Sequence, residues 1–137
     1  MGDIYGKKGD KYKTIEYYQK SIDIKLDYID SYISLGFCLI KYGKIEEAKP
    51  VLLKAIELGD LDTSNMNLGH VYLCKKEEGK AIQCYQASLS QFENKDNFWA
   101  GMKDDYQYLV QYGITEAYYQ TILEKIRVNT KGVFQKP

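Results

Sequence analysis

Residues 32–58 read YISLGFCLIKYGKIEEAKPVLLKAIEL, and this stretch decides the fold. Apolar residues recur at steps of three and four on both sides of Gly43, which is the pattern of two helices that each bury one face. Gly43 ends the first helix, and Gly59 follows the second. Pro50 lies beyond the first turn of the second helix, which we expect to be kinked but continuous. The stretch therefore predicts a helical hairpin.

The same pattern returns along the chain at an interval of 33 or 34 residues. The paired small and large positions are Thr14 and Tyr18, Ala48 and Leu52, Ala81 and Tyr85, and Thr115 and Tyr119. Such an interval is typical of repeat architectures, in which each supersecondary unit stacks on the next. Strict alternation of apolar and polar residues, the mark of a strand, is absent. The sequence predicts an all-α, right-handed solenoid of about three and a half helix hairpins.

The register also predicts where the units begin and end. They are a partial unit at 1–28, full units at 29–61 and 62–95, and a final unit at 96–128. The first unit is partial because only eight residues, MGDIYGKK, precede Gly9, too few for a stable partner helix. Residues 129–137 show no helical period, so we expect a single domain over 1–128 followed by a loose tail.

Two units carry nearly the same motif in both helices. The second unit has Tyr32, Leu35, Gly36 and Leu39 followed by Ala48, Leu52 and Ala55; the third has Asn65, Leu68, Gly69 and Tyr72 followed by Ala81, Tyr85 and Ser88. This motif resembles the tetratricopeptide repeat, which pairs a Trp-x2-Leu-Gly-x2-Tyr helix with an Ala-x3-Phe-x2-Ala helix. Residues Thr14, Tyr18 and Ser21 match the second half of an earlier copy, and Trp99, Met102, Tyr106, Thr115 and Tyr119 a diverged final one.

Small residues in this motif have a packing role of their own. Gly36, Gly69 and Ala48 let two helices approach closely, and large side chains enter the gaps between them. In the last unit, Lys103 and Ile122 stand where small residues belong. This departure argues against close packing of a further repeat and is typical of an end-cap.

The resemblance implies that a peptide or protein partner binds on the concave wall formed by the first helices of the hairpins. The residues that turn away from the partner helix are Ile33, Ser34, Phe37 and Lys41 in the second unit, Met66, Asn67, His70 and Cys74 in the third, and Asp104, Gln107 and Tyr108 in the fourth. The strongest candidates are Phe37, Asn67, His70 and Tyr108. The alternative interpretation is that several apolar residues of these helices, Ile33 and Leu73 especially, belong to the core between repeats.

One binding mode of the family can be compared directly. Tetratricopeptide domains that hold the acidic carboxyl terminus of heat-shock chaperones carry Lys and Asn in the first inner helices and Lys and Arg in the third. The matching positions here are Ile33, Phe37, Asn67, Asn97 and Gly101. Only Asn67 fits, so we do not expect this heat-shock carboxylate clamp.

An alternative function is self-association. The helix predicted around Ile15, Tyr18 and Ile22 lacks a partner before it, which leaves its apolar flank uncovered. Uncovered apolar patches are frequent interaction sites. A structural role as a homo-oligomer through these three residues is therefore the second hypothesis.

Charge and composition exclude other partners. Lysine plus arginine and aspartate plus glutamate both number 19, so no net field attracts nucleic acid or an anionic membrane. The three cysteines, Cys38, Cys74 and Cys84, form no CxxC pair, which favours reduced thiols. No apolar run approaches the roughly 18 residues of a membrane span. We expect a cytoplasmic protein that binds neither nucleic acid nor membrane.

No enzyme constellation is evident. His70 is the one histidine; with Cys74, four residues on, it could supply two ligands to zinc, whereas a structural zinc site uses four. A glycine-rich phosphate loop is missing as well. The sequence predicts no catalysis, cofactor or metal site, and a hydrolase or metal enzyme built on His70 would lack partners for it.

Overall fold

The structure of this chain is a computed structural model, which describes the backbone of residues 8–25 and 28–135 and the side chains of 12–25 and 28–128. Its α-helices are α2 (Lys8–Ile24), α3 (Ile29–Lys41), α4 (Ile45–Glu57), α5 (Thr63–Cys74), α6 (Glu78–Gln91), α7 (Lys95–Leu109) and α8 (Glu116–Gln135), and a 3-10 helix, η1, spans Val110–Tyr112. These residues include no strand. The predicted all-α solenoid is confirmed.

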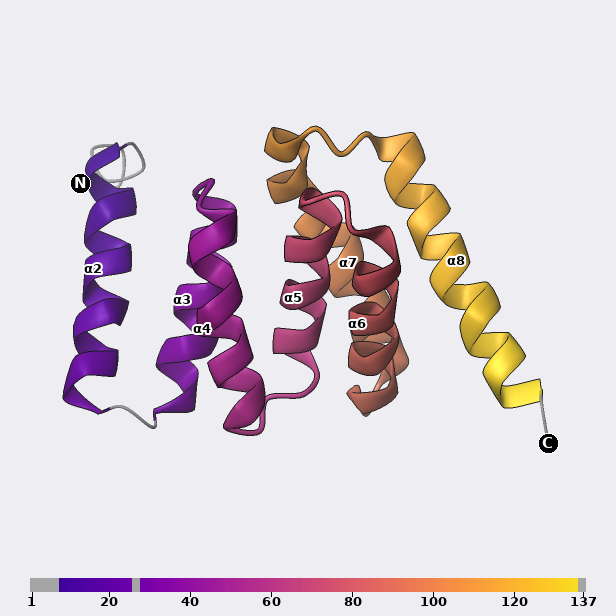
Figure 1. Ribbon diagram of the computed structural model, residues 1–137, viewed down its shortest axis with the longest axis horizontal. Helices are drawn as coiled ribbons and strands as arrows, with labels where there is room; N and C mark the ends of the chain where they lie inside the picture. The colour runs from indigo at the N-terminus through magenta and orange to yellow at the C-terminus, as the bar shows by residue number, and fades with distance from the viewer. Residues whose placement is uncertain (1–7, 26–27, 136–137) are drawn as a thin grey trace.

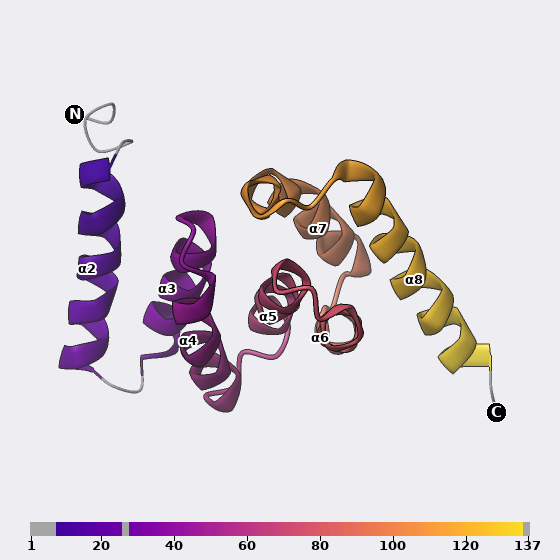
Figure 2. The ribbon, with the colours of Figure 1, turned by 45° about the horizontal axis from the view of Figure 1, so that its top comes forward.

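The helices stack in chain order along the long axis of the molecule. In Figure 1, α2 and α8 lie at opposite ends, with the hairpins α3/α4 and α5/α6 between them. Helix α2 packs against α3, α4 packs against α5, and the two hairpins are thereby joined into one row. Helix α7 leaves this row: the two views show it crossing beside α5 and α6 (Figure 2), and it also contacts α3.

In the hairpins α3/α4 and α5/α6, called here the closed hairpins, a glycine of the first helix packs against a buried side chain of the second helix. A Cβ atom placed on Gly36 would lie 2.8 Å from Cγ of Leu52, and one on Gly69 would lie 2.6 Å from the Tyr85 ring. Leu52 and Tyr85 are both 0% exposed. Neither neighbour could move aside without disturbing the core, so the close approach of the helices requires glycine at both positions.

The hairpin of α7 and α8, called here the open hairpin, is built differently. Lys103 occupies the position of Gly36 and Gly69 in the repeat. In the described residues, the backbones of α7 and α8 do not approach each other as those of the closed hairpins do. Tyr119, 2% exposed, spans the wider gap, and its hydroxyl donates to the carbonyl oxygen of Met102 at 2.6 Å.

Two expectations about individual helices have different outcomes. Helix α4 runs without interruption through Pro50, so its predicted continuity is confirmed. Helix α8 does not end near Val128 but continues to Gln135, where the sequence predicts a loose tail. The prediction relied on the loss of an apolar stripe, which marks the end of burial and not the end of helical backbone.

Candidate binding surface

The inner side of the solenoid brings together residues of α3 and α7. The rings of Phe37 and Tyr108 meet edge to face, with centroids 5.4 Å apart and planes at 90°. The amine of Lys41 lies 5.5 Å from the Phe37 ring and 5.8 Å from the Tyr108 ring. All three side chains are partly exposed. The structure thus places three of the predicted site residues in one aromatic and cationic cluster.

Helix α7 reaches α3 because residues after it cap the end of α3. The last carbonyl groups of a helix have no partner within it. Here the Gln111 side-chain amide donates to the carbonyl oxygen of Lys41 at 2.9 Å, and the Tyr112 hydroxyl donates to that of Ile40 at 2.5 Å. Burial raises the pKa of Tyr112 to about 12, so its hydroxyl keeps its proton and remains a donor.

A second link joins α7 to α5 through His70, which is 0% exposed. Its Nε2 atom lies 3.0 Å from an Asp105 carboxylate oxygen, and its Nδ1 atom lies 2.7 Å from the Tyr85 hydroxyl. A carboxylate accepts, so Nε2 is the donor toward Asp105, and Nδ1 is paired with the Tyr85 hydroxyl. Burial raises the pKa of Tyr85 well above its ordinary value, which keeps the phenol a donor.

Asp105 is the residue that the sequence interpretation missed. A signal for it exists, because Phe98, Met102, Asp105 and Leu109 follow one another at steps of four, three and four. The three apolar members of this stripe are 0% exposed. A carboxylate inside a buried stripe requires a donor facing it, and His70 in the neighbouring helix is that donor.

Three predicted binding residues lie in the interior instead. Met66, Asn67 and His70 are 4%, 2% and 0% exposed. The prediction assumed an open wall of parallel first helices, whereas α7 lies across α5 and covers it: a Cβ atom on Gly101 would come within 3.2 Å of the Met66 methyl carbon. The placement of these three on an open wall is therefore wrong.

The other candidates divide between the core and the surface. Leu73 is 0% exposed and Ile33 packs partly buried against the core, as the alternative interpretation has it. Cys74 and Ser34 are partly buried. Asp104 and Gln107 are exposed on α7. We call Phe37, Lys41, Asp104, Gln107 and Tyr108 the inner surface.

The flank predicted for self-association is covered within the chain. Ile22 is 6% exposed and belongs to the core, and Ile15 and Tyr18 pack partly buried against it. Helix α3 lies against α2 and provides this cover. The apolar side chains that α2 does expose are others, with Tyr17 67% and Ile24 87% exposed.

The thiols of the chain are unsuited to nucleophilic chemistry. Burial raises the pKa of Cys74 to about 12 and that of Cys84 to about 11, and it raises the pKa of Cys38 as well. A thiol is reactive as its thiolate, which these environments disfavour. Among the side chains that the structure describes, those of 12–25 and 28–128, no cluster of three or more His, Cys, Asp or Glu is placed to hold a metal ion. In the same ranges no helix has the length and apolar character to cross a membrane.

Comparison with known proteins identifies the repeat. The family model described as "Tetratricopeptide repeat" matches residues 1–28, 29–58 and 63–94, more than half of the chain. The chain belongs to the tetratricopeptide repeat family. The matched ranges start within one residue of the predicted first, second and third units, and they leave out the fourth, where Lys103 replaces the motif glycine. Tetratricopeptide repeats generally mediate protein–protein interactions, and they are typically non-catalytic.

One curated protein is similar to part of this chain. It is the RNA polymerase-associated protein CTR9 of Saccharomyces cerevisiae, 30% identical over 83 residues. The matched part is 61% of this chain and 8% of CTR9. The chain thus spans a small fraction of the length of this tetratricopeptide relative.

Proposed function

We propose that this chain is a non-catalytic protein-interaction module that binds a peptide or protein partner through the inner surface. The observation that carries the proposal is the cluster of Phe37, Lys41 and Tyr108, because it joins two helices that are far apart in sequence. Lys41 forms no ion pair with any residue that the structure describes. Its amine is therefore free to meet a carboxylate of a partner.

The chemistry of the inner surface suits a peptide. The rings of Phe37 and Tyr108 offer apolar contact area, and aromatic residues are enriched where proteins bind one another. Gln107 and Asp104 lie exposed beside Tyr108, and their side chains can bond to the main chain of a bound segment. The free amine of Lys41 adds a preference for an acidic neighbour.

Site-specific photo-crosslinking tests this proposal. A benzophenone amino acid replaces Gln107, which is exposed on the inner surface; the matched control replaces Gln83, which is equally exposed but lies on α6. In an extract of the cells that naturally express the chain, we expect a discrete crosslinked product from position 107 that is absent from position 83. Phe37→Ala with Tyr108→Ala should remove this product while circular dichroism shows the same helix content. The same product from both positions, or its survival in the double variant, would contradict the proposal.

Self-association through α2 is a second candidate function, favoured by the exposure of Tyr17 and Ile24. The apolar contact it requires would lie on the side of α2 that α3 does not cover. Light scattering over a concentration series tests it directly: a rise in molar mass that Ile24→Asp and Tyr17→Asp abolish supports self-association. A constant monomer mass excludes it and leaves the inner surface as the proposed site.

A further inference from the structure

The open hairpin encloses a cleft that the inner surface does not include. This cleft has a volume of about 560 Å³ and lies between α7 and α8. A volume of several hundred cubic ångströms accommodates a small ligand or a few side chains of a peptide. The residues that matter to the argument are Trp99, Lys103 and Tyr106 of α7 and Tyr119, Leu123 and Arg127 of α8.

The cleft lies in the unit that lacks the motif glycine. In the closed hairpins, Gly36 and Gly69 lie against Leu52 and Tyr85, and no space is left between the helices. Lys103 stands at the same position of α7, and there the backbones of the two helices of the hairpin do not approach closely. The residues that line the space between α7 and α8 belong to the fourth unit.

The floor of the cleft is apolar and its rim is cationic. Tyr119 and Leu123 are 2% and 8% exposed, and the rings of Tyr106 and Tyr119 pack with centroids 5.1 Å apart. Lys103 and Arg127 are exposed at the rim. Neither forms an ion pair with a residue in the described part of the chain. One carboxylate, Glu116, faces these two cations across the lining.

The guanidinium group of Arg127 packs on the ring of Trp99. Its guanidinium carbon lies 4.3 Å from the centre of the indole ring. Stacking of this kind orients the guanidinium plane and leaves its N–H donors free at the edge, where a carboxylate can accept two hydrogen bonds. The floor supplies a place for an apolar side chain next to that carboxylate.

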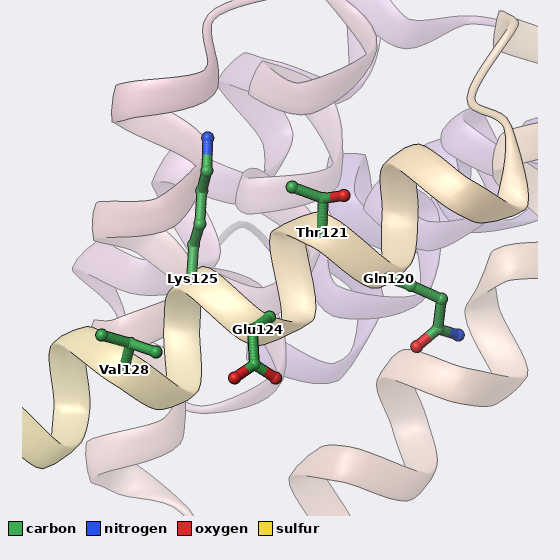
Figure 3. A pocket seen from close by; sticks show the side chains of 5 residues that line it. All are labelled: Gln120, Thr121, Glu124, Lys125 and Val128. Atoms are coloured by element: carbon green, nitrogen blue, oxygen red, sulfur yellow. The ribbon is translucent and has the colours of Figure 1, made fainter.

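Other side chains of α8 differ from this arrangement. Lys125 donates to Glu78 of α6, so its charge is already matched. A hollow of about 440 Å³ on α8 is lined by Gln120, Thr121, Glu124, Lys125 and Val128, all from this one helix. Figure 3 shows these side chains projecting to different sides of α8, with no second helix contributing a wall. Among the described side chains of α8, the cation without an ion pair is Arg127, and it lies in the cleft that has two helical walls.

Trp99 of the cleft and Tyr108 of the inner surface lie on opposite sides of α7, whereas Lys103 and Gln107, four residues apart, lie next to each other. Trp99 and Tyr108 are nine residues apart, which at about 3.6 residues per turn is about two and a half turns.

We propose that the cleft between α7 and α8 is a second binding site, which takes an acidic peptide segment of a protein partner. An apolar or aromatic side chain of that segment lies on Tyr119 and Leu123, and neighbouring carboxylates pair with Arg127 and Lys103. Charge complementarity selects this occupant, because the rim presents two unpaired cations above an apolar floor. The site does not depend on the inner surface being a binding site.

The chain contains its own reporter for this test. Trp99 is the one tryptophan, so a single indole N–H signal in the nitrogen-15 NMR spectrum reports on the cleft. Peptides are first selected from a phage-displayed random library against the intact chain, and the selected sequences are synthesised and titrated. We expect enrichment of aspartate and glutamate beside apolar residues, and a saturable shift of the Trp99 indole signal.

Charge-removing variants separate the cleft from the rest of the surface. Lys103→Gln with Arg127→Gln should weaken binding of the selected peptide by about a hundredfold, since each of the two lost charge-assisted hydrogen bonds contributes about 1.5 kcal/mol. Lys49→Gln with Lys54→Gln, two lysines of α4, is the matched control and should leave the affinity unchanged. Phe37→Ala should also leave it unchanged, because that residue belongs to the inner surface.

Each other outcome overturns the proposal. Selected peptides that leave the Trp99 indole signal in place bind elsewhere, and peptides without acidic enrichment refute the charge argument. Equal affinity for the parent chain and the Lys103→Gln, Arg127→Gln variant would show that the rim cations are not used. A peptide that loses affinity on Phe37→Ala but not on these changes supports the inner surface and refutes the cleft.

Discussion

The closed hairpins and the open hairpin use the same repeat position in opposite ways. In α3/α4 and α5/α6 a glycine lies against Leu52 or Tyr85, and each hairpin is held by its own interior. In α7/α8 that position is Lys103, and contacts to earlier helices help to place the unit: Asp105 with His70, Tyr112 of η1 with Ile40, and α8 with α6. The unit without the motif glycine is thus the one whose two helices are separated by a cleft.

Valine at the repeat position shared by Gly69 and Lys103 should give the largest difference in stability between the closed and the open hairpins. Gly69→Val places a branched side chain where the fully buried Tyr85 ring lies, so we expect a loss of about 3 kcal/mol in the free energy of unfolding. Lys103→Val, at the same repeat position of the exposed α7 face, should change it by less than about 0.5 kcal/mol. Urea denaturation followed by circular dichroism measures both.

Gly79 provides the control for the change from glycine to valine in a helix. It lies in α6, and no atom lies within 4 Å of a Cβ atom added there. Gly79→Val should be neutral or slightly stabilising, since valine is the better helix former. If Gly69→Val and Gly79→Val gave equal losses, close approach would not be the reason for glycine in the closed hairpins.

The closed hairpins could be predicted from the sequence because their determinants are local. Gly69 and Tyr85 lie 16 residues apart in one unit, and the repeat presents the same pair again as Gly36 and Leu52. The path of α7 could not be predicted in this way. It depends on Asp105 with His70, 35 residues away, and on Tyr112 with Ile40, 72 residues away, and neither contact recurs in another unit.

The binding surface was predicted in part for the same reason. Phe37, Lys41 and Tyr108 share a side of their helices, and the helical period is enough to place them there. Asn67 and His70 have the same period, but their exposure depends on what covers α5, which no periodicity reports. A lone histidine beside the apolar Met66 and Leu73 indicates a buried hydrogen-bonded pair as much as a ligand-binding group.

Removing Asp105 should weaken the hold of α7 on α5. Asp105→Ala leaves the Nε2 proton of the fully buried His70 without an acceptor, for which we expect a loss of about 2 kcal/mol. Asp105→Asn should recover most of it, because the amide oxygen accepts the same hydrogen bond. Asp104→Ala, the exposed neighbour, is the control and should change the free energy of unfolding by less than about 0.5 kcal/mol. Equal losses for the two alanine variants would show that the histidine contact does not hold α7.

The smallest expected change in the free energy of unfolding comes from the contact between α8 and α6. The pKa of Glu78 is held below its ordinary value, first by the hydrogen bond from Lys125 and then by that from Tyr118. A carboxyl group whose pKa is lower in the folded chain adds stability above its unfolded pKa of about 4.3, and this stability is lost as the pH falls through the folded value. The Lys125 and Glu78 side chains are 47% and 35% exposed, so solvent screening limits the gain to about 0.5 kcal/mol at neutral pH.

Glu78→Gln should therefore lower the free energy of unfolding by about 0.5 kcal/mol at pH 7, and the difference from the parent chain should vanish in acid, below the folded pKa of Glu78. Glu57→Gln is the control, because Glu57 pairs with Lys54 in its own helix and joins no second one. A double-mutant cycle with Lys125→Gln isolates the contact between the helices. A coupling energy of zero at pH 7 would mean that α8 is held against α6 by its apolar side chains alone, Ile122 and Ile126 among them. The open hairpin would then share the apolar packing of the closed ones and differ from them in the spacing of its two helices.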